Sequence, residues 1–109
     1  MHELAIAESV VASVLEHTGG RRVAVVRLRV GRLAGVVPDA LSFCFDLATT
    51  GTSLEGASLE LVEEHARAHC RSCSCDFVVD DPILLCGCGS ADVQLLSGQD
   101  LCVTSVEVL

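Results

Sequence analysis

The clustering of cysteines constrains the fold of this chain more than any other feature, since five of the seven lie between positions 70 and 88. Cys70 and Cys73 form a C-x-x-C pair, and Cys86 and Cys88 form a C-x-C pair after twelve intervening residues. In a reducing cytosol such a cluster indicates metal ligands rather than disulfides. Four thiolates make a closed tetrahedral site that suits Zn²⁺, and because no coordination position stays open, we predict a structural role.

The identity of the ligands and of the ion leaves alternatives. The second pair is one residue shorter than usual, so Cys75 can replace one of its members, and His65 or His69 can enter the site. A four-thiolate site also suits iron, as in rubredoxin-like electron carriers. Cys44 and Cys102 fall within apolar segments and are expected to be inert core residues. The zinc ligands that we predict are Cys70, Cys73, Cys86 and Cys88.

The amino terminus is a second candidate metal site. A free α-amine next to His2 offers three nitrogens in one plane, namely the amine of Met1, the intervening amide and the imidazole. Tetragonal nitrogen sets of this kind favour Ni(II) or Cu(II). Glu3 adds a backbone nitrogen or a carboxylate. An α-amine titrates near about pH 7.7–8.0 and must lose its proton, so metal binding should weaken on acidification.

The periodicity of apolar residues predicts the secondary structure. Apolar side chains recur at three- and four-residue spacings over 4–15, which favours an amphipathic helix that ends at Gly19. Pro38 suits the first turn of a second helix. Around Arg27 and Arg29 the sequence alternates, which predicts a strand whose arginines face solvent. The predicted elements are helices over 2–18 and 38–50 and strands over 22–30, 57–64 and 101–109.

The order of these elements predicts an α+β fold, with two helices packed on one face of a three-stranded sheet and an inserted small zinc-ribbon-like β subdomain. We expect one domain formed by residues 1–65 plus 99–109 and a zinc-binding subdomain over 66–98. The insert is too short to be stable by burial alone, so the metal should supply its folding free energy. The residues of the last strand that are expected to face the core are Leu101, Val103 and Ser105.

The charge balance bears on the class of partner. Seven arginines and no lysine stand against fifteen acidic residues, giving a formal net charge of −8. Such a chain is poorly suited to displace counterions from nucleic acid. Five of the arginines precede residue 33, and we interpret them mainly as a solvated strand face. The sequence shows no basic leader and no apolar run of about 20 residues, so we expect a cytoplasmic protein that does not enter membranes.

A series of short motifs extends over nearly the whole chain, and their order and spacing are specific as a set. The motifs are Met1-His2-Glu3-Leu4, Val30-Gly31-Arg32-Leu33, Val37 through Leu41, Phe43-Cys44-Phe45-Asp46, Gly51-Thr52 with Glu55-Gly56-Ala57, Cys70-x-x-Cys73, Cys88-Gly89-Ser90, and Gly98 with Leu101 and Ser105-Val106-Glu107. The set resembles the HypA/HybF family of hydrogenase nickel-insertion proteins. The chain departs from the family pattern of two C-x-x-C pairs at Cys86-x-Cys88.

The resemblance implies a nickel metallochaperone. It implies a nickel site at His2 with Glu3 and the Met1 amine, and a zinc site formed by the four cysteines of the two pairs. It further implies delivery of Ni²⁺ to the large subunit of [NiFe]-hydrogenase together with a HypB-like GTPase. We therefore expect a protein that is not an enzyme, present as a monomer or weak dimer. The alternative function is a zinc-ribbon protein-interaction module without a nickel role.

Overall fold

The computed structural model describes residues 2–79 and 83–109 of the chain. The two helices and three strands predicted from periodicity are present, with each end within one residue of its predicted position. Three further strands lie in the Cys-rich segment, for which the sequence predicted a β subdomain without the bounds of its strands. The elements in chain order are α1 (His2–Thr18), β1 (Val23–Gly31), α2 (Pro38–Thr49), β2 (Ser58–Glu64), β3 (Ala66–Cys70), β4 (Asp76–Val79), β5 (Val93–Ser97) and β6 (Leu101–Val108).

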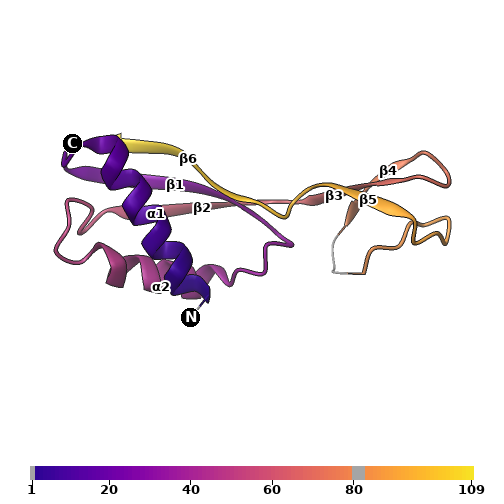
Figure 1. Ribbon diagram of the computed structural model, residues 1–109, viewed down its shortest axis with the longest axis horizontal. Helices are drawn as coiled ribbons and strands as arrows, with labels where there is room; N and C mark the ends of the chain where they lie inside the picture. Colours follow the sequence, from indigo (N-terminus) through magenta and orange to yellow (C-terminus); the bar gives the residue numbers. More distant parts are fainter. Residues whose placement is uncertain (1, 80–82) are drawn as a thin grey trace. The chain divides into compact units, whose positions relative to one another are not determined.

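The strands form two three-stranded sheets, with the order β2-β1-β6 in one and β4-β3-β5 in the other (Figure 1). The chain divides into two compact units. Unit 1 contains both helices, and unit 2 contains the β4-β3-β5 sheet and the clustered cysteines. The domain bounds at 1–65 plus 99–109 and at 66–98 stay a prediction. The bounds of unit 1 are Met1–Leu28, Val36–Val62 and Cys102–Leu109, and those of unit 2 are Arg29–Gly35 and Glu63–Leu101.

Unit 1 has the predicted α+β architecture, with α1 and α2 packed against each other and covering one face of the β2-β1-β6 sheet (Figure 1). The core is aliphatic apart from one aromatic ring, because Phe45 of α2 is the only fully buried phenylalanine among the described residues. Val26 and Leu28 of β1 point into this core, as the alternation predicts. No helix in the described chain is both long enough and apolar enough to cross a membrane.

The other face of the β2-β1-β6 sheet carries charge. Arg27 lies at its centre and pairs with Glu60 of β2 at 3.0 Å and with Glu107 of β6 at 2.5 Å. These two carboxylates raise the pKa of Arg27 through hydrogen bonds, first from Glu107 and then from Glu60. Exposed pairs of this kind add little stability each. The prediction that the early arginines form a solvated strand face is correct for Arg27.

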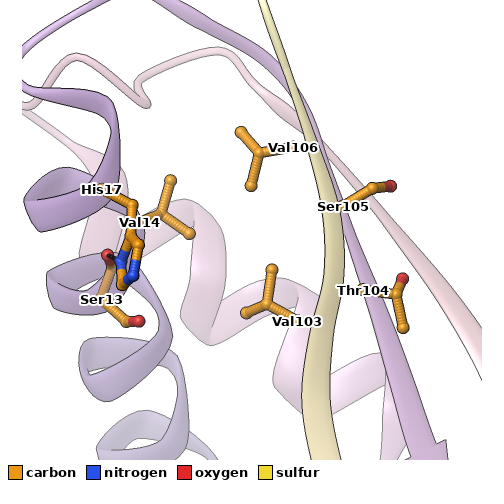
Figure 2. Close-up of a pocket in the computed structure, with 7 residues that line it drawn as sticks. All are labelled: Ser13, Val14, His17, Val103, Thr104, Ser105 and Val106. Atoms are coloured by element: carbon orange, nitrogen blue, oxygen red, sulfur yellow. Dashed lines mark hydrogen bonds between the residues drawn. The ribbon is translucent and has the colours of Figure 1, made fainter.

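The alternation predicted for β6 fails in its middle. Figure 2 shows Val103 and Val106 on the side of α1, whereas Thr104 and Ser105 lie on the opposite side of the strand. The Ser105 hydroxyl accepts a hydrogen bond from Arg27 there, so the prediction that Ser105 faces the core is wrong. Two successive residues on one side interrupt the period of two, as an extra residue does in a β-bulge.

Unit 2 has a small core that depends on close backbone packing. Its buried apolar cluster contains only Ala66, Ala68 and Val79, with larger side chains partly buried around them. Gly98 has φ +93°, and a Cβ on it would lie 2.3 Å from the Cα of Ala66. A Cβ on Gly31 would likewise lie 2.2 Å from the carbonyl of Gly98. These approaches require glycine and leave little apolar side-chain area to stabilise the unit.

Candidate metal centre

The structure brings four sulfur atoms together in unit 2. The Sγ atoms of Cys70, Cys73, Cys86 and Cys88 all lie within 4.8 Å of one another. Cys70 Sγ lies 3.7 Å from Cys88 Sγ, and Cys73 Sγ lies 3.6 Å from Cys86 Sγ. A tetrahedral zinc site with Zn–S bonds of about 2.3 Å requires neighbouring sulfurs about 3.8 Å apart. The four thiols therefore fit a structural zinc ion.

Both cysteine pairs lie in turns that are closed in the same way. In the first turn, Cys70 N–H donates to the Cys75 carbonyl and Ser74 N–H donates to the Cys70 carbonyl, each at 2.8 Å. In the second, Cys86 N–H donates to Ser90 and Gly89 N–H donates back to Cys86, each at 2.9 Å. The second turn has the same pair of hydrogen bonds but contains one residue fewer between its ends. This difference accounts for the C-x-C spacing.

The residues at the left-handed position of the two turns also correspond. Ser74 has φ +61° and Gly89 has φ +92°, and Ser74 is the only described residue other than glycine with a positive φ. Glycine adopts this conformation without strain, whereas serine pays a steric cost there. Gly89 thus permits the tight turn of the second pair.

The alternative ligands lie outside the sulfur cluster. Cys75 is exposed, and its Sγ lies 3.7 Å from the carbonyl of Cys73, while its own carbonyl closes the first turn. His69 lies on β3 with Nδ1 2.6 Å from Asp76 Oδ1. His65 is exposed between β2 and β3. The two cysteines outside the cluster, Cys44 and Cys102, are half-buried.

The four thiols differ in acidity. The pKa of Cys70 is lowered to about 6, first by a hydrogen bond from the backbone N–H of Cys73 and then by one from Ser72, against the effect of burial. The pKa values of the other three are raised. For each of these, a backbone N–H two residues later favours the thiolate, but contacts with neighbouring sulfurs and burial outweigh it. Several thiolates this close need a cation to ionise together.

These acidities predict how many protons zinc displaces. Near pH 7 the metal-free site should already hold the Cys70 thiolate and three neutral thiols, so Zn²⁺ binding should release about three protons. Because the three raised pKa values lie above this pH, zinc affinity should increase as the pH rises. Calorimetric titration in buffers of different ionisation enthalpy measures the count. Release of nearly four protons per zinc ion would contradict the lowered pKa of Cys70.

Contacts around the sulfurs were not predicted from the sequence. The hydroxyls of Ser72 and Ser90 lie 2.8 Å apart and connect the two turns directly. Arg71 Nη1 lies 2.9 Å from Asp92 Oδ1, and the Arg71 N–H donates to the Asp92 carbonyl at 3.0 Å. Contacts of this kind orient metal ligands. Their only sequence signal is a serine in each turn, which has no distinctive spacing.

At the amino terminus the structure describes His2 and Glu3, while Met1 lies outside the described residues. Both belong to the first turn of α1. The His2 side chain is 58% exposed, and its Nδ1 lies 3.5 Å from Glu3 Oε2. The same carboxylate oxygen accepts a hydrogen bond from Val37 N–H at 3.2 Å. This bond is the largest cause of the lowered pKa of Glu3, so the carboxylate is ionised at neutral pH.

Unit 1 also holds a hollow of about 390 Å³, whose lining includes no residue of either metal-binding candidate (Figure 2). It is formed by the last turns of α1 and by β6, and valine, serine and threonine make up most of its lining. His17 is its one titratable residue, and His17 Nδ1 donates to the Ser13 carbonyl at 2.8 Å. The hollow has no second titratable group to work with His17, so we assign it no catalytic role.

The fold and the four-thiol cluster define a small α+β protein with a zinc-ribbon-like unit whose four cysteines fit a structural zinc ion. The model of one family, described as hydrogenase/urease nickel incorporation, metallochaperone, hypA, matches residues 1–108. The chain belongs to this HypA family, which confirms the resemblance inferred from its motifs.

Curated relatives agree with this assignment, and a solved structure agrees in fold. A hydrogenase maturation factor HypA from Nostoc punctiforme is 42% identical over 108 residues, covering 99% of this chain and 96% of that protein. One from Geotalea uraniireducens is 43% identical over 109 residues, with 99% of each covered. The solution structure of the Ni metallochaperone HypA from Helicobacter pylori has a TM-score of 0.68 at 18% identity, covering 98% of this chain and 97% of that one, and supports the fold.

Proposed function

We propose that this chain binds Ni²⁺ through its amino-terminal residues and delivers it for the maturation of [NiFe]-hydrogenase, while the four cysteines hold a structural zinc ion. The observation that carries the proposal is the match of residues 1–108 to a family of nickel-incorporation metallochaperones. Its relatives are named hydrogenase maturation factors. The proposed nickel ligands are Met1, His2 and Glu3.

The position of these residues at the start of α1 supports nickel binding. The first four N–H groups of a helix have no partner within the helix, so the amide nitrogens of His2 and Glu3 can lose their protons without breaking its hydrogen bonds. The Glu3 carboxylate is occupied by Val37 N–H, which favours its amide nitrogen as the ligand. Together with the amine and the imidazole, these amide nitrogens make a nitrogen-rich ligand set that suits Ni(II).

Two features of this terminus suit a protein that gives its metal away. The exposed His2 side chain can be reached by an incoming ligand while the other nitrogens still hold the ion. The positive end of the α1 dipole opposes a cation, which should weaken the complex, and the ionised Glu3 offsets part of this effect. A buried site without these features would release its metal more slowly.

The proposed GTPase partner follows from the absence of a phosphate-binding loop in this chain. Its sequence contains no Gly-rich phosphate loop, so any GTP hydrolysis that drives delivery must come from a partner, for which we propose a HypB-like GTPase. The acceptor that we propose is the large subunit of [NiFe]-hydrogenase. Free thiols arranged for zinc favour the cytoplasm as the place of action. We further propose that the chain acts without catalytic chemistry of its own.

Complementation tests the function in cells. A strain that lacks its own HypA should regain hydrogenase activity at limiting nickel when it expresses the untagged chain. The His2→Ala variant should restore less than about a tenth of that activity, because the loss of the imidazole weakens nickel binding at least about 100-fold. Equal accumulation of both proteins on immunoblots is the control. Full activity with His2→Ala would exclude nickel delivery through this terminus.

A further inference from the structure

The outer face of α2 exposes apolar side chains in a pattern that packing within the chain does not explain. Phe43 is 65% exposed and Leu47 is 55% exposed. They are four residues apart on α2 and are therefore neighbours on the helix surface. Phe43 is one of only three aromatic residues in the chain, and its neighbour Phe45 is buried in the core. Clustered exposed side chains of this size are typical of binding surfaces.

This apolar pair is flanked by acidic groups. Asp39 precedes Phe43 by one helical turn, and Asp46 follows it by about one turn. Both carboxylates are exposed, and neither takes part in an ion pair among the described residues. The sequence of α2 contains no arginine, lysine or histidine. We call Asp39, Phe43, Asp46 and Leu47, together with Val37 at the start of the helix, the α2 face.

Its charge identifies the class of occupant. Anionic lipids and nucleic acids would be repelled by the two aspartates. A second copy docked through the same face by a two-fold axis would bring these acidic groups together, which like-charge repulsion opposes. A protein surface with an apolar centre and a basic rim satisfies both the phenylalanine and the carboxylates.

We propose that the α2 face docks a protein partner that presents apolar side chains surrounded by lysine and arginine. The face begins beside the amino terminus, because Val37 is 57% exposed and its N–H holds the Glu3 carboxylate. A partner docked there would lie next to His2 and Glu3. The docking does not depend on the proposed function. Only the inference that the docked partner lies next to a bound nickel ion rests on that function.

Two synthetic peptides test the docking on the zinc-loaded protein. Both form amphipathic helices with leucine on one face, but one carries lysine on its polar face and the other glutamate. The leucine–lysine peptide should shift the amide NMR signals of residues 37–50, and the leucine–glutamate peptide should not. Phe43→Ser should weaken binding of the first peptide at least about tenfold, as loss of a central aromatic anchor does.

Val62→Ser is the matched control, because Val62 is 61% exposed on β2 of the same unit. Equal weakening by Phe43→Ser and Val62→Ser, or signal shifts confined to other residues, would overturn the proposal. So would sedimentation of the wild-type chain, but not of Phe43→Ser, with vesicles of anionic lipid. Nickel titration of the same proteins separates the two proposals. If the peptide does not bind but nickel does, only the docking proposal fails. If nickel does not bind but the peptide does, only the proposed function fails.

Discussion

Replacing His2 by alanine is expected to weaken Ni²⁺ binding at least about 100-fold, or about 2.7 kcal/mol, while zinc content stays unchanged. The imidazole is the one side-chain nitrogen in the proposed ligand set, and the amine and amides alone form a poorer site for Ni(II). His2 is exposed, so its loss should not affect folding. Calorimetric titration of untagged, zinc-loaded protein at mildly alkaline pH measures the change.

His17→Ala provides the matched control for this experiment. His17 is also an exposed histidine of α1, but it lies in the last turn and binds the Ser13 carbonyl. This variant should bind Ni²⁺ as the wild type does. Equal nickel affinity in the wild type and in His2→Ala would contradict the proposed nickel site and would favour the alternative, a zinc-ribbon interaction module that binds zinc only.

Replacing Cys73 by serine is expected to abolish zinc binding and to unfold unit 2. The apolar cluster of that unit is built on two alanines and one valine, which cannot balance the conformational entropy of a segment of this length. A structural zinc ion contributes on the order of 10–16 kcal/mol of folding free energy in small domains. Unit 1 has its own core around Phe45 and should keep its helices. Amide NMR dispersion, followed residue by residue, measures both effects.

Cys75→Ser is the control for the zinc site, because Cys75 lies two residues from Cys73 but outside the sulfur cluster. It should keep the zinc content and the folded spectrum of unit 2. If Cys75→Ser loses zinc while Cys73→Ser retains it, Cys75 and not Cys73 is the zinc ligand. Visible colour in protein purified without added metal would instead indicate iron, since Zn²⁺ is colourless.

The elements that the sequence predicted well are those with strong periodicity. The helix over 2–18 and the strand around Arg27 follow directly from the spacing of their apolar residues. The strands of the Cys-rich segment have a weaker signal, because β3 has alanine and cysteine at its buried positions and β4 and β5 have only four and five residues. The reversal in β6 that turns Ser105 outward also escaped prediction, since it depends on a polar contact with Arg27 rather than on hydrophobicity.

For the metal sites too, local sequence patterns predicted some features and contacts between distant residues escaped prediction. Cysteine spacing predicted which four sulfurs come together, because a short pair can direct both thiols to one side of a turn. The contact between the Glu3 carboxylate and Val37 N–H joins residues far apart in the sequence, so no local pattern announces it. Helical spacing places Leu41 and Phe45 on one face of α2 and leaves Phe43 off it, in agreement with the burial of the first two and the exposure of Phe43.

The central claim is that the unblocked amino terminus holds nickel, and native mass spectrometry tests it most directly. The untagged chain and the same chain acetylated at its α-amine are each given equal amounts of Zn²⁺ and Ni²⁺. Acetylation turns the α-amine of Met1 into an amide and removes it from the chelate. The account predicts one zinc and one nickel per untagged chain, but zinc alone in the acetylated chain. Equal nickel in both proteins, or none in the untagged one, would contradict it.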